Sequence, residues 1–167
     1  MSEENRKIAF ICSKGNLDMV YPALVMGWAA IGNGIDVTIF FTFWGMDMIR
    51  ELRVDHLQVA PVANTSMKMS MMGVDTGNLG IPNIMGVLPG MTAFATKLMK
   101  DKMDGLDVPP VREYLEMMVD AGAKLYGCKM SVDMFDLEED DMIDEVDGIL
   151  NVSDFIEMIE GAQTMFV

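Results

Sequence analysis

The run KIAFIC at residues 7–12 is apolar almost throughout and follows a polar, charged start. A strand with one solvated face alternates apolar and polar residues, whereas a strand buried on both faces is continuously apolar. Strands of the second kind are typical of parallel sheets that helices cover on both sides. The run therefore predicts a strand of a parallel α/β sheet.

The next 30 residues or so complete a βαβ unit. A turn at 13–16 is followed by apolar residues at helical spacing from Leu17 to Ala29, and Gly32-Asn33-Gly34 should end that helix. Pro22 is expected near the first turn, where its missing N–H costs least. Residues 35–41 are rich in β-branched and aromatic side chains and predict a second strand. The crossover of such a unit is right-handed in nearly all proteins.

The middle of the chain, residues 45–110, has a weaker pattern. Helices are expected at 46–52 and 91–103, and a methionine-rich tract occupies 67–72. Glycine and proline interrupt residues 79–90. Excursions of this kind are typical of lids and of oligomer contacts.

The last third of the chain again alternates strands and helices. The expected elements are a helix opened by Pro110, a strand at 124–127 that delivers Cys128, a helical turn or short helix at 131–135, an acidic stretch at 136–147, a strand at 148–150, a helix capped by Asn151 or Ser153 and closed by Gly161, and a strand at 164–167. The last helix is expected to hold Phe155, Ile156 and Ile159. We predict one three-layer α/β/α domain over residues 1–167, with an open, mostly parallel sheet.

Composition excludes several classes of partner. The chain of 167 residues has a formal net charge of −14, which disfavours nucleic acid and anionic membrane surfaces. The longest apolar region, residues 81–99, contains two prolines, two glycines and a lysine, so no transmembrane segment is expected. The polar N-terminus does not resemble a signal peptide. The two cysteines form neither a disulfide framework nor a zinc pattern, which favours a reducing, cytoplasmic location.

Both cysteines stand where chemistry is expected. Ligands in open parallel sheets bind beyond the carboxyl ends of the strands, and Cys12 and Cys128 each close a predicted strand. Cys128 also precedes a predicted helix start, where backbone N–H groups stabilise an anion. Lys129 adds a positive charge next to it. Cys128 is therefore the candidate nucleophile.

Four segments carry a resemblance to a known family. In chain order they are Lys14–Asp18 with Tyr21-Pro22-Ala23, Ile39–Gly45, the cysteine segment Lys124–Asp133, and Asn151–Phe155. Together they resemble the DsrE/DsrF-like sulfurtransferase superfamily, in particular its branch called peroxiredoxin-like. The resemblance runs through the whole chain in order.

The resemblance implies a DsrE-like fold and a sulfur-relay function. Cys128 would hold persulfide sulfur and pass it between sulfur donor and acceptor proteins, without a metal or organic cofactor. Relatives assemble as oligomers, often trimers or hexamers, so a homo-oligomer is expected. Whether the chain turns over as an enzyme stays open. Thiol peroxidase activity is not expected, because neither cysteine has the neighbours of a peroxiredoxin site.

Further residues are candidates for stabilising the thiolate or lining its pocket: Lys129, Ser131, Cys12, Lys14, Gly15 and Trp44. Each has a plainer interpretation. Cys12 is either a resolving partner or a packed core thiol, and the turn at Lys14 and Gly15 either binds an anion or only joins a strand to a helix. Trp44, with Phe41 and Phe43, either walls the cysteine or belongs to the core.

Other patterns favour structural roles. The tract with Met67, Met69, Met71 and Met72 resembles a soft-metal site, although an apolar interface explains it better. The acids at 136–147 lack the glycine and spacing of a calcium loop, so a solvated connection is expected. His56, the single histidine, is expected at the surface. The alternative function is a non-catalytic oligomeric module that docks a redox or membrane partner through the methionine-rich middle.

Overall fold

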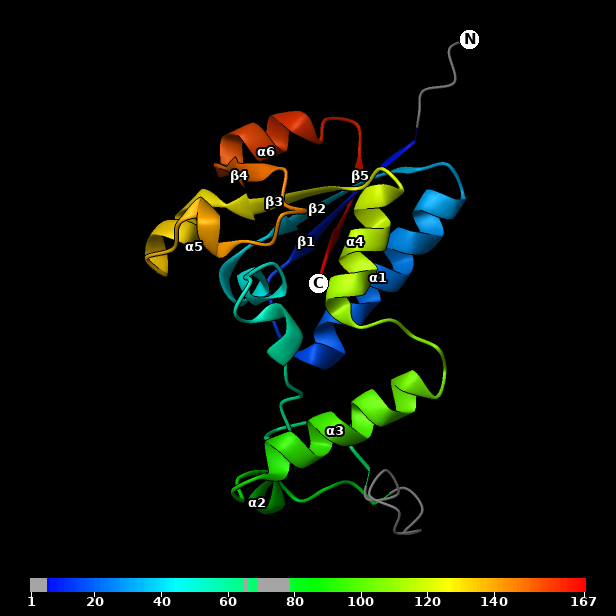
Figure 1. The fold of residues 1–167 in the computed structure, drawn as a ribbon, viewed down its shortest axis with the longest axis vertical. Helices are drawn as coiled ribbons and strands as arrows, with labels where there is room; N and C mark the ends of the chain where they lie inside the picture. Colours follow the sequence, from blue (N-terminus) through cyan, green and yellow to red (C-terminus); the bar gives the residue numbers. More distant parts are fainter. Residues whose placement is uncertain (1–5, 65, 69–78) are drawn as a thin grey trace. The chain divides into compact units, whose positions relative to one another are not determined.

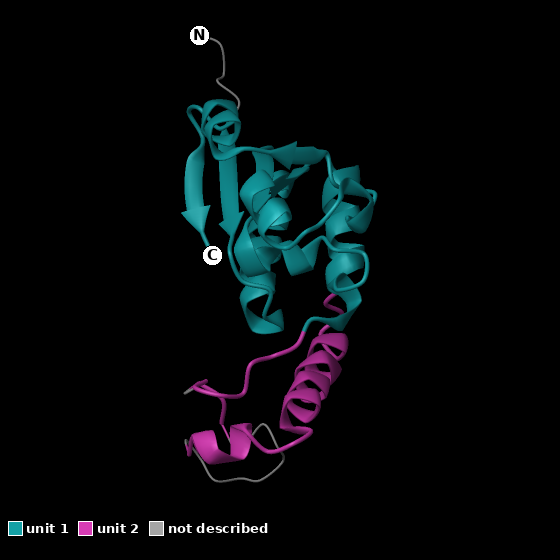
Figure 2. Ribbon diagram, turned by 90° about the vertical axis from the view of Figure 1, so that its left-hand side faces the viewer, with its two compact units in different colours: residues 1–57, 110–167 teal, residues 58–109 magenta. Residues whose placement is uncertain are grey.

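The computed structural model describes residues 6–64, 66–68 and 79–167. Its strands and helices, with 3-10 helices labelled η, are in chain order β1 Lys7–Cys12, α1 Leu17–Gly32, β2 Asp36–Phe41, η1 Phe43–Met48, η2 Val54–His56, α2 Asn83–Gly86, α3 Met91–Asp104, α4 Val111–Asp120, β3 Lys124–Cys128, α5 Lys129–Met134, η4 Glu139–Asp141, β4 Gly148–Leu150, α6 Val152–Met158 and β5 Gln163–Phe166. The chain divides into two compact units, residues 1–57 with 110–167 (unit 1) and residues 58–109 (unit 2), coloured separately in Figure 2.

Unit 1 contains a five-stranded sheet in the order β4-β3-β2-β1-β5, in which all four pairings are parallel. The predicted class, a three-layer α/β/α fold with an open parallel sheet, is confirmed. β1 and β2 occupy the interior of the sheet, which explains why their sequences are almost continuously apolar. In Figure 1, α1 and α4 lie on one face of the sheet and α6 on the other.

Side-chain alternation assigns the core to two layers. Phe10 and Val37 face α1, whose Gly27 lies so close to the sheet that a Cβ there would contact both side chains and Met118 of α4. On the opposite face, Ala9, Phe40 and Cys128 pack with Phe155 of α6. The carboxyl ends of β1, β2 and β3 lie along one edge of the sheet, because the three strands are parallel neighbours.

Several local predictions need correction. Pro22 lies in the second turn of α1, because the helix already starts at Leu17; its fixed φ suits the helix, at the loss of one backbone N–H donor. The helix expected at 46–52 is the 3-10 helix η1, which starts earlier, at Phe43. The predicted helical turn at 131–135 is α5, which begins directly after Cys128. In α6 only Phe155 is buried, and Ile156 is exposed.

Unit 2 contains the helices α2 and α3. The helix predicted at 91–103 is confirmed as α3, and the interrupted region before it holds only the short helix α2 and a bridge between Lys68 and Gly80. Met67 is buried, whereas Met69, Met71 and Met72 lie outside the described residues. The expectation of a single domain over 1–167 stays a prediction.

We expect Gly45→Ala to destabilise the protein by about 3 kcal/mol or more. A Cβ at this position would lie 2.0 Å from the carbonyl oxygen of Cys12, and neither backbone has a flexible end that can yield. Urea unfolding measures the effect.

Gly32→Ala is the matched control, because it lies in α1 with nothing within 4 Å of the added methyl group. Alanine has the higher helix propensity, so this variant should be as stable as the parent or up to about 1 kcal/mol more stable. Equal stability of Gly45→Ala and the parent would show that the close approach is not required.

Candidate functional site

Cys128 is the last residue of β3 and the N-cap residue of α5. The strand leads directly into the helix, so the thiol stands at the carboxyl edge of the sheet, as predicted. The absence of a side chain at Gly127 allows Ile149 and Met46 to pack close to its backbone, because a Cβ there would lie 2.7 Å from Ile149 and 3.3 Å from Met46. The first N–H groups of a helix have no intrahelical acceptor, so this position offers donors to an anion.

The Cys128 side chain is nevertheless only 1% exposed in the single chain. It belongs to an apolar cluster with Ala9, Phe40 and Phe155. The rings of Phe40 and Phe155 stack with centroids 4.1 Å apart and an interplanar angle of 11°. Phe155 is the one buried residue of the short helix α6, and the partly buried Ile159 at the end of that helix also packs against the cluster.

Lys129 occupies the first turn of α5, and its ammonium group pairs with the carboxylate of Asp133 one turn further on. Both side chains are more than half exposed. The positive charge predicted beside the thiol is therefore partly balanced within the same helix.

Ser131 connects α5 to the segment that follows β2. Its hydroxyl is completely buried and accepts a hydrogen bond of 2.7 Å from the backbone N–H of Phe43. The hydroxyl of Thr42 lies 3.3 Å from it and completes a buried polar pair. Phe43 has a positive φ of 47°, so this bond holds a backbone conformation that a bulky residue rarely adopts. The Ser131 side chain therefore links α5 to the segment that follows β2 through a hydrogen bond.

Among the other predicted residues, Cys12, Gly15 and Trp44 lie in or next to backbone contacts between the segments that follow β1 and β2. The amide of Thr42 donates to the carbonyl of Cys12 at 2.9 Å. A Cβ on Gly15 would lie 2.6 Å from the carbonyl oxygen of Trp44, so the loops after β1 and β2 touch directly. Lys14 is exposed in this turn. The Trp44 side chain is 61% exposed and makes an edge contact with Phe135 at 5.4 Å, so it does not enclose Cys128.

Cys12 lies on the opposite face of the sheet from Cys128. In the register, Cys12 pairs with Phe41, and Phe41 pairs with Gly127, so Cys128 projects to the other side. With β2 between them, their strands are roughly 9.5 Å apart, beyond the Cα separation that a disulfide tolerates. Both cysteines are free. This spacing does not allow a disulfide between Cys12 and Cys128 of one chain, and burial raises the pKa of the Cys12 thiol to about 12.

Two features are absent from the described residues, 6–64, 66–68 and 79–167. No helix in these ranges is both long and apolar enough to cross a membrane. No three His, Cys, Asp or Glu side chains within the same ranges are grouped to hold a metal ion. His56 is exposed, as predicted.

The sheet order, the flanking helices and the cysteine at the junction of β3 and α5 define a parallel α/β protein with a candidate thiol at the carboxyl edge of its sheet. The sequence matches the model of the DsrE/DsrF/DrsH-like family over residues 4–166, and the chain belongs to this family. The resemblance found in its four sequence segments is thus confirmed.

Two relatives align over most or all of the chain. The sulfur carrier protein DsrE2 of Allochromatium vinosum is 35% identical over 144 residues, which cover 86% of this chain and 87% of the relative. The uncharacterized protein YrkE of Bacillus subtilis is 25% identical over the full length of both chains.

Solved structures support the fold alone. The protein of unknown function MTH1491 from Methanobacterium thermoautotrophicum superimposes with a TM-score of 0.56 at 8% identity, covering 98% of this chain and all of its own. The ychN protein of E. coli gives a TM-score of 0.51 at 11% identity, covering 97% and 99% of the two chains.

Sequence reasoning missed two features of this edge. Thr42 and Phe43 position α5 through Ser131, but a tie that depends on a positive φ at phenylalanine leaves no signal in the sequence. Met130 and Met134 are exposed on α5, and their spacing of four residues was a readable sign of a shared helical face.

We expect Ser131→Ala to lower the free energy of unfolding by about 1 kcal/mol, because it removes the hydroxyl that accepts a part-buried hydrogen bond from the N–H of Phe43. Thermal and urea unfolding measure the loss. Ser153→Ala, on the exposed side of α6, is the control and should change stability by no more than about 0.5 kcal/mol. An equal change in the free energy of unfolding for the two variants would show that Ser131 has no special structural role.

The raised pKa of Cys12 predicts a loss of stability at high pH. Below its ordinary value of 9.0 the thiol is protonated in both states. Between pH 9 and about 12 the unfolded chain has released the proton while the folded chain retains it, so stability falls by about 1.4 kcal/mol per pH unit. The measurement is the difference between the pH profiles of unfolding for the parent and Cys12→Ala. A difference that does not change between pH 9 and 12 would contradict burial of Cys12.

Proposed function

We propose that this protein is a sulfur carrier that holds persulfide sulfur on Cys128. The main support is the sulfur carrier DsrE2, which is 35% identical over 86% of this chain. Membership of the DsrE/DsrF/DrsH-like family supports the same sulfur-relay role. The position of Cys128, at the end of a parallel strand and the start of a helix, suits a nucleophilic thiolate.

The transfer step exchanges one sulfur atom and needs no external oxidant or reductant. The Cys128 thiolate attacks the outer sulfur of a donor persulfide, R–S–SH. A new S–S bond forms to Cys128 while the donor's S–S bond breaks, and the donor leaves as the thiolate R–S⁻. The product Cys128–S–SH then passes its outer sulfur to an acceptor thiolate in the same way.

The burial of Cys128 sets a condition on this chemistry. A donor reaches the sulfur only when the cover formed by Phe155 and α6 opens. Short elements with few buried side chains open at a lower cost than the rest of a protein. The carrier function therefore includes a local opening at α6, either spontaneous or induced by a partner.

The proposed function also includes a location, an oligomeric state and a class of partner. We place the protein in the cytoplasm, because two free cysteines suit a reducing compartment. Its partners are sulfur donor and acceptor proteins, and its assembly is a homo-oligomer. No cofactor is needed, because the thiol itself carries the sulfur.

Treatment with inorganic polysulfide should add a single sulfur atom, detected by intact-protein mass spectrometry and removed by a reductant. Cys128→Ser should lose the adduct. Cys12→Ser should keep it, because Cys12 lies on the opposite face of the sheet from Cys128 and is not the proposed carrier. An adduct that persists in Cys128→Ser would reject the assignment of the carrier residue.

The second candidate function is a non-catalytic binding module, and the 1% exposure of Cys128 is the observation that favours it. A module of this kind would dock a partner through the methionine-rich middle. If polysulfide leaves the mass unchanged and an alkylating reagent modifies Cys128 only after denaturation, the thiol is structural and the module is the better description.

A further inference from the structure

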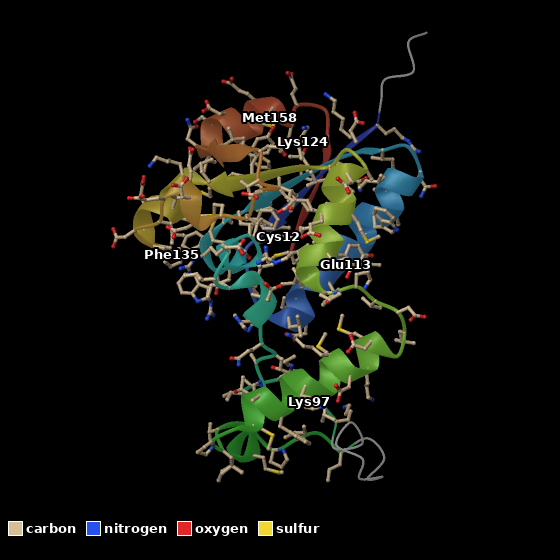
Figure 3. All side chains as sticks on the ribbon, viewed as in Figure 1. Cys12, Lys97, Glu113, Lys124, Phe135 and Met158 are labelled. Atoms are coloured by element: carbon tan, nitrogen blue, oxygen red, sulfur yellow. The ribbon has the colours of Figure 1, made fainter. Side chains whose placement is uncertain are left out.

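An exposed apolar surface lies beside Cys128 on unit 1. It comprises the exposed residues Phe43, Trp44, Met130 and Met134 together with the half-buried Phe135, and is called here the α5 patch. Trp44 and Met130 are more than half exposed, at 61% and 52%. Figure 3 labels Phe135 next to α5, at the outer side of the unit.

The three aromatic rings of the α5 patch form a connected row. Phe43 stacks on Trp44 with centroids 6.1 Å apart, and Trp44 meets the ring of Phe135 edge-on at 5.4 Å. Met130 and Met134 lie four residues apart and therefore share a face of α5. The bond from Phe43 to Ser131 fixes the row against α5, so the patch is held in place rather than carried on a free loop. Exposed aromatic and methionine side chains are the types enriched at protein interfaces.

The segment that follows the patch is strongly acidic. Residues 129–147 contain nine acidic side chains and a single basic one, Lys129, which pairs with Asp133. Asp136, Glu138, Glu139 and Asp140 are exposed directly after Phe135. An apolar patch with an acidic border complements a partner surface with the opposite charge at its rim.

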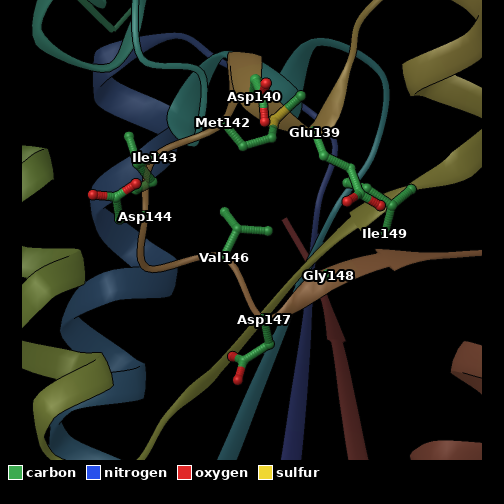
Figure 4. Close-up of a pocket in the computed structure, with 9 residues that line it drawn as sticks. All are labelled: Glu139, Asp140, Met142, Ile143, Asp144, Val146, Asp147, Gly148 and Ile149. Carbon is green, nitrogen blue, oxygen red and sulfur yellow. The ribbon is translucent and has the colours of Figure 1, made fainter.

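A pocket of about 470 Å³ lies within the same acidic segment (Figure 4). The acidic residues Glu139, Asp140 and Asp144 line it together with aliphatic residues such as Val146. Asp147 lines it as well, but its carboxylate is already paired with Lys124. This lining suits a lysine or arginine side chain, which combines an aliphatic stem with a cationic head.

The net charge of the chain favours some binding partners of the α5 patch over others. Two copies of a chain with a net charge of −14 would bring their acidic segments together, which opposes self-association at this surface. An anionic lipid surface is repelled for the same reason. A basic protein surface is attracted.

We propose that the α5 patch is the docking site for a protein partner that presents apolar side chains surrounded by lysine or arginine. The inference deepens the proposed function, because a partner bound there sits against the helix that begins at Cys128. Its role as sulfur donor or acceptor rests on that function, whereas the binding itself does not.

The test uses the full-length chain and a synthetic amphipathic helix of leucine and lysine as the probe. Trp28→Phe leaves Trp44 as the single tryptophan, so its emission reports on the patch. Binding should shift the Trp44 emission to shorter wavelength and weaken as salt is added. Met130→Ser combined with Met134→Ser should raise the Kd about 10-fold. Ile156→Ser, which removes an exposed apolar side chain from α6, should leave the Kd unchanged.

A second comparison separates local charge from net charge. Neutralising Asp136, Glu138, Glu139 and Asp140 to their amides should raise the Kd about 10-fold. Neutralising four other exposed acids, Glu113, Glu116, Glu157 and Glu160, removes the same charge and should have a much smaller effect. Equal effects of the two sets would reject the site, because attraction would then be general.

Two further outcomes would overturn the proposal. A probe that binds without shifting the Trp44 emission would place the interaction elsewhere. An oligomer that dissociates in sedimentation when Met130 and Met134 become serine would assign the patch to a second copy of the chain. Cys128→Ser should bind the probe as the parent does, so a failure of docking and a failure of persulfide formation are separate results.

Discussion

The direct contact between the loops that follow β1 and β2 is the constraint on which the candidate site depends. The amide of Thr42 donates to the carbonyl of Cys12, and Gly45 lies against the same carbonyl with no room for a side chain. This contact turns the chain sharply after β2 and starts η1 at Phe43. The amide of Phe43 is then presented to Ser131, which positions α5 and the residue before it, Cys128.

The parallel register separates the two thiols into different environments. Alternation along the strands sends Cys12 to the face of α1 and Cys128 to the face of α6, although both residues end their strands at the same edge. Both thiols are buried, but their covers differ. A long helix of 16 residues packs over the face of Cys12, whereas α6 has seven residues and one buried anchor. Under the proposed function, Cys128 is therefore the thiol that we expect a local opening at α6 to expose.

The sequence was informative wherever burial imposes a periodic pattern. The apolar run at residues 7–12 and the helical spacing from Leu17 gave the right elements, because strands buried on both faces and amphipathic helices leave distinct repeats. The start of η1 at Phe43 and its 3-10 geometry were missed, because they result from a close backbone approach rather than from a repeat. The exposure of Ile156 was missed as well, since an apolar residue on a helix can face either the sheet or the solvent. The burial of Cys128 depends on Phe155, a contact between distant positions that sequence spacing does not encode.

The five strands come entirely from residues 7–12, 36–41, 124–128, 148–150 and 163–166, so residues 58–109 supply none of them. Every rung of the parallel ladder is therefore independent of the length of that insertion. The entropic cost of closing such a segment grows only with the logarithm of its length. A change in the length of residues 58–109 would accordingly leave the strand register and the cysteine-bearing edge of this sheet as they are.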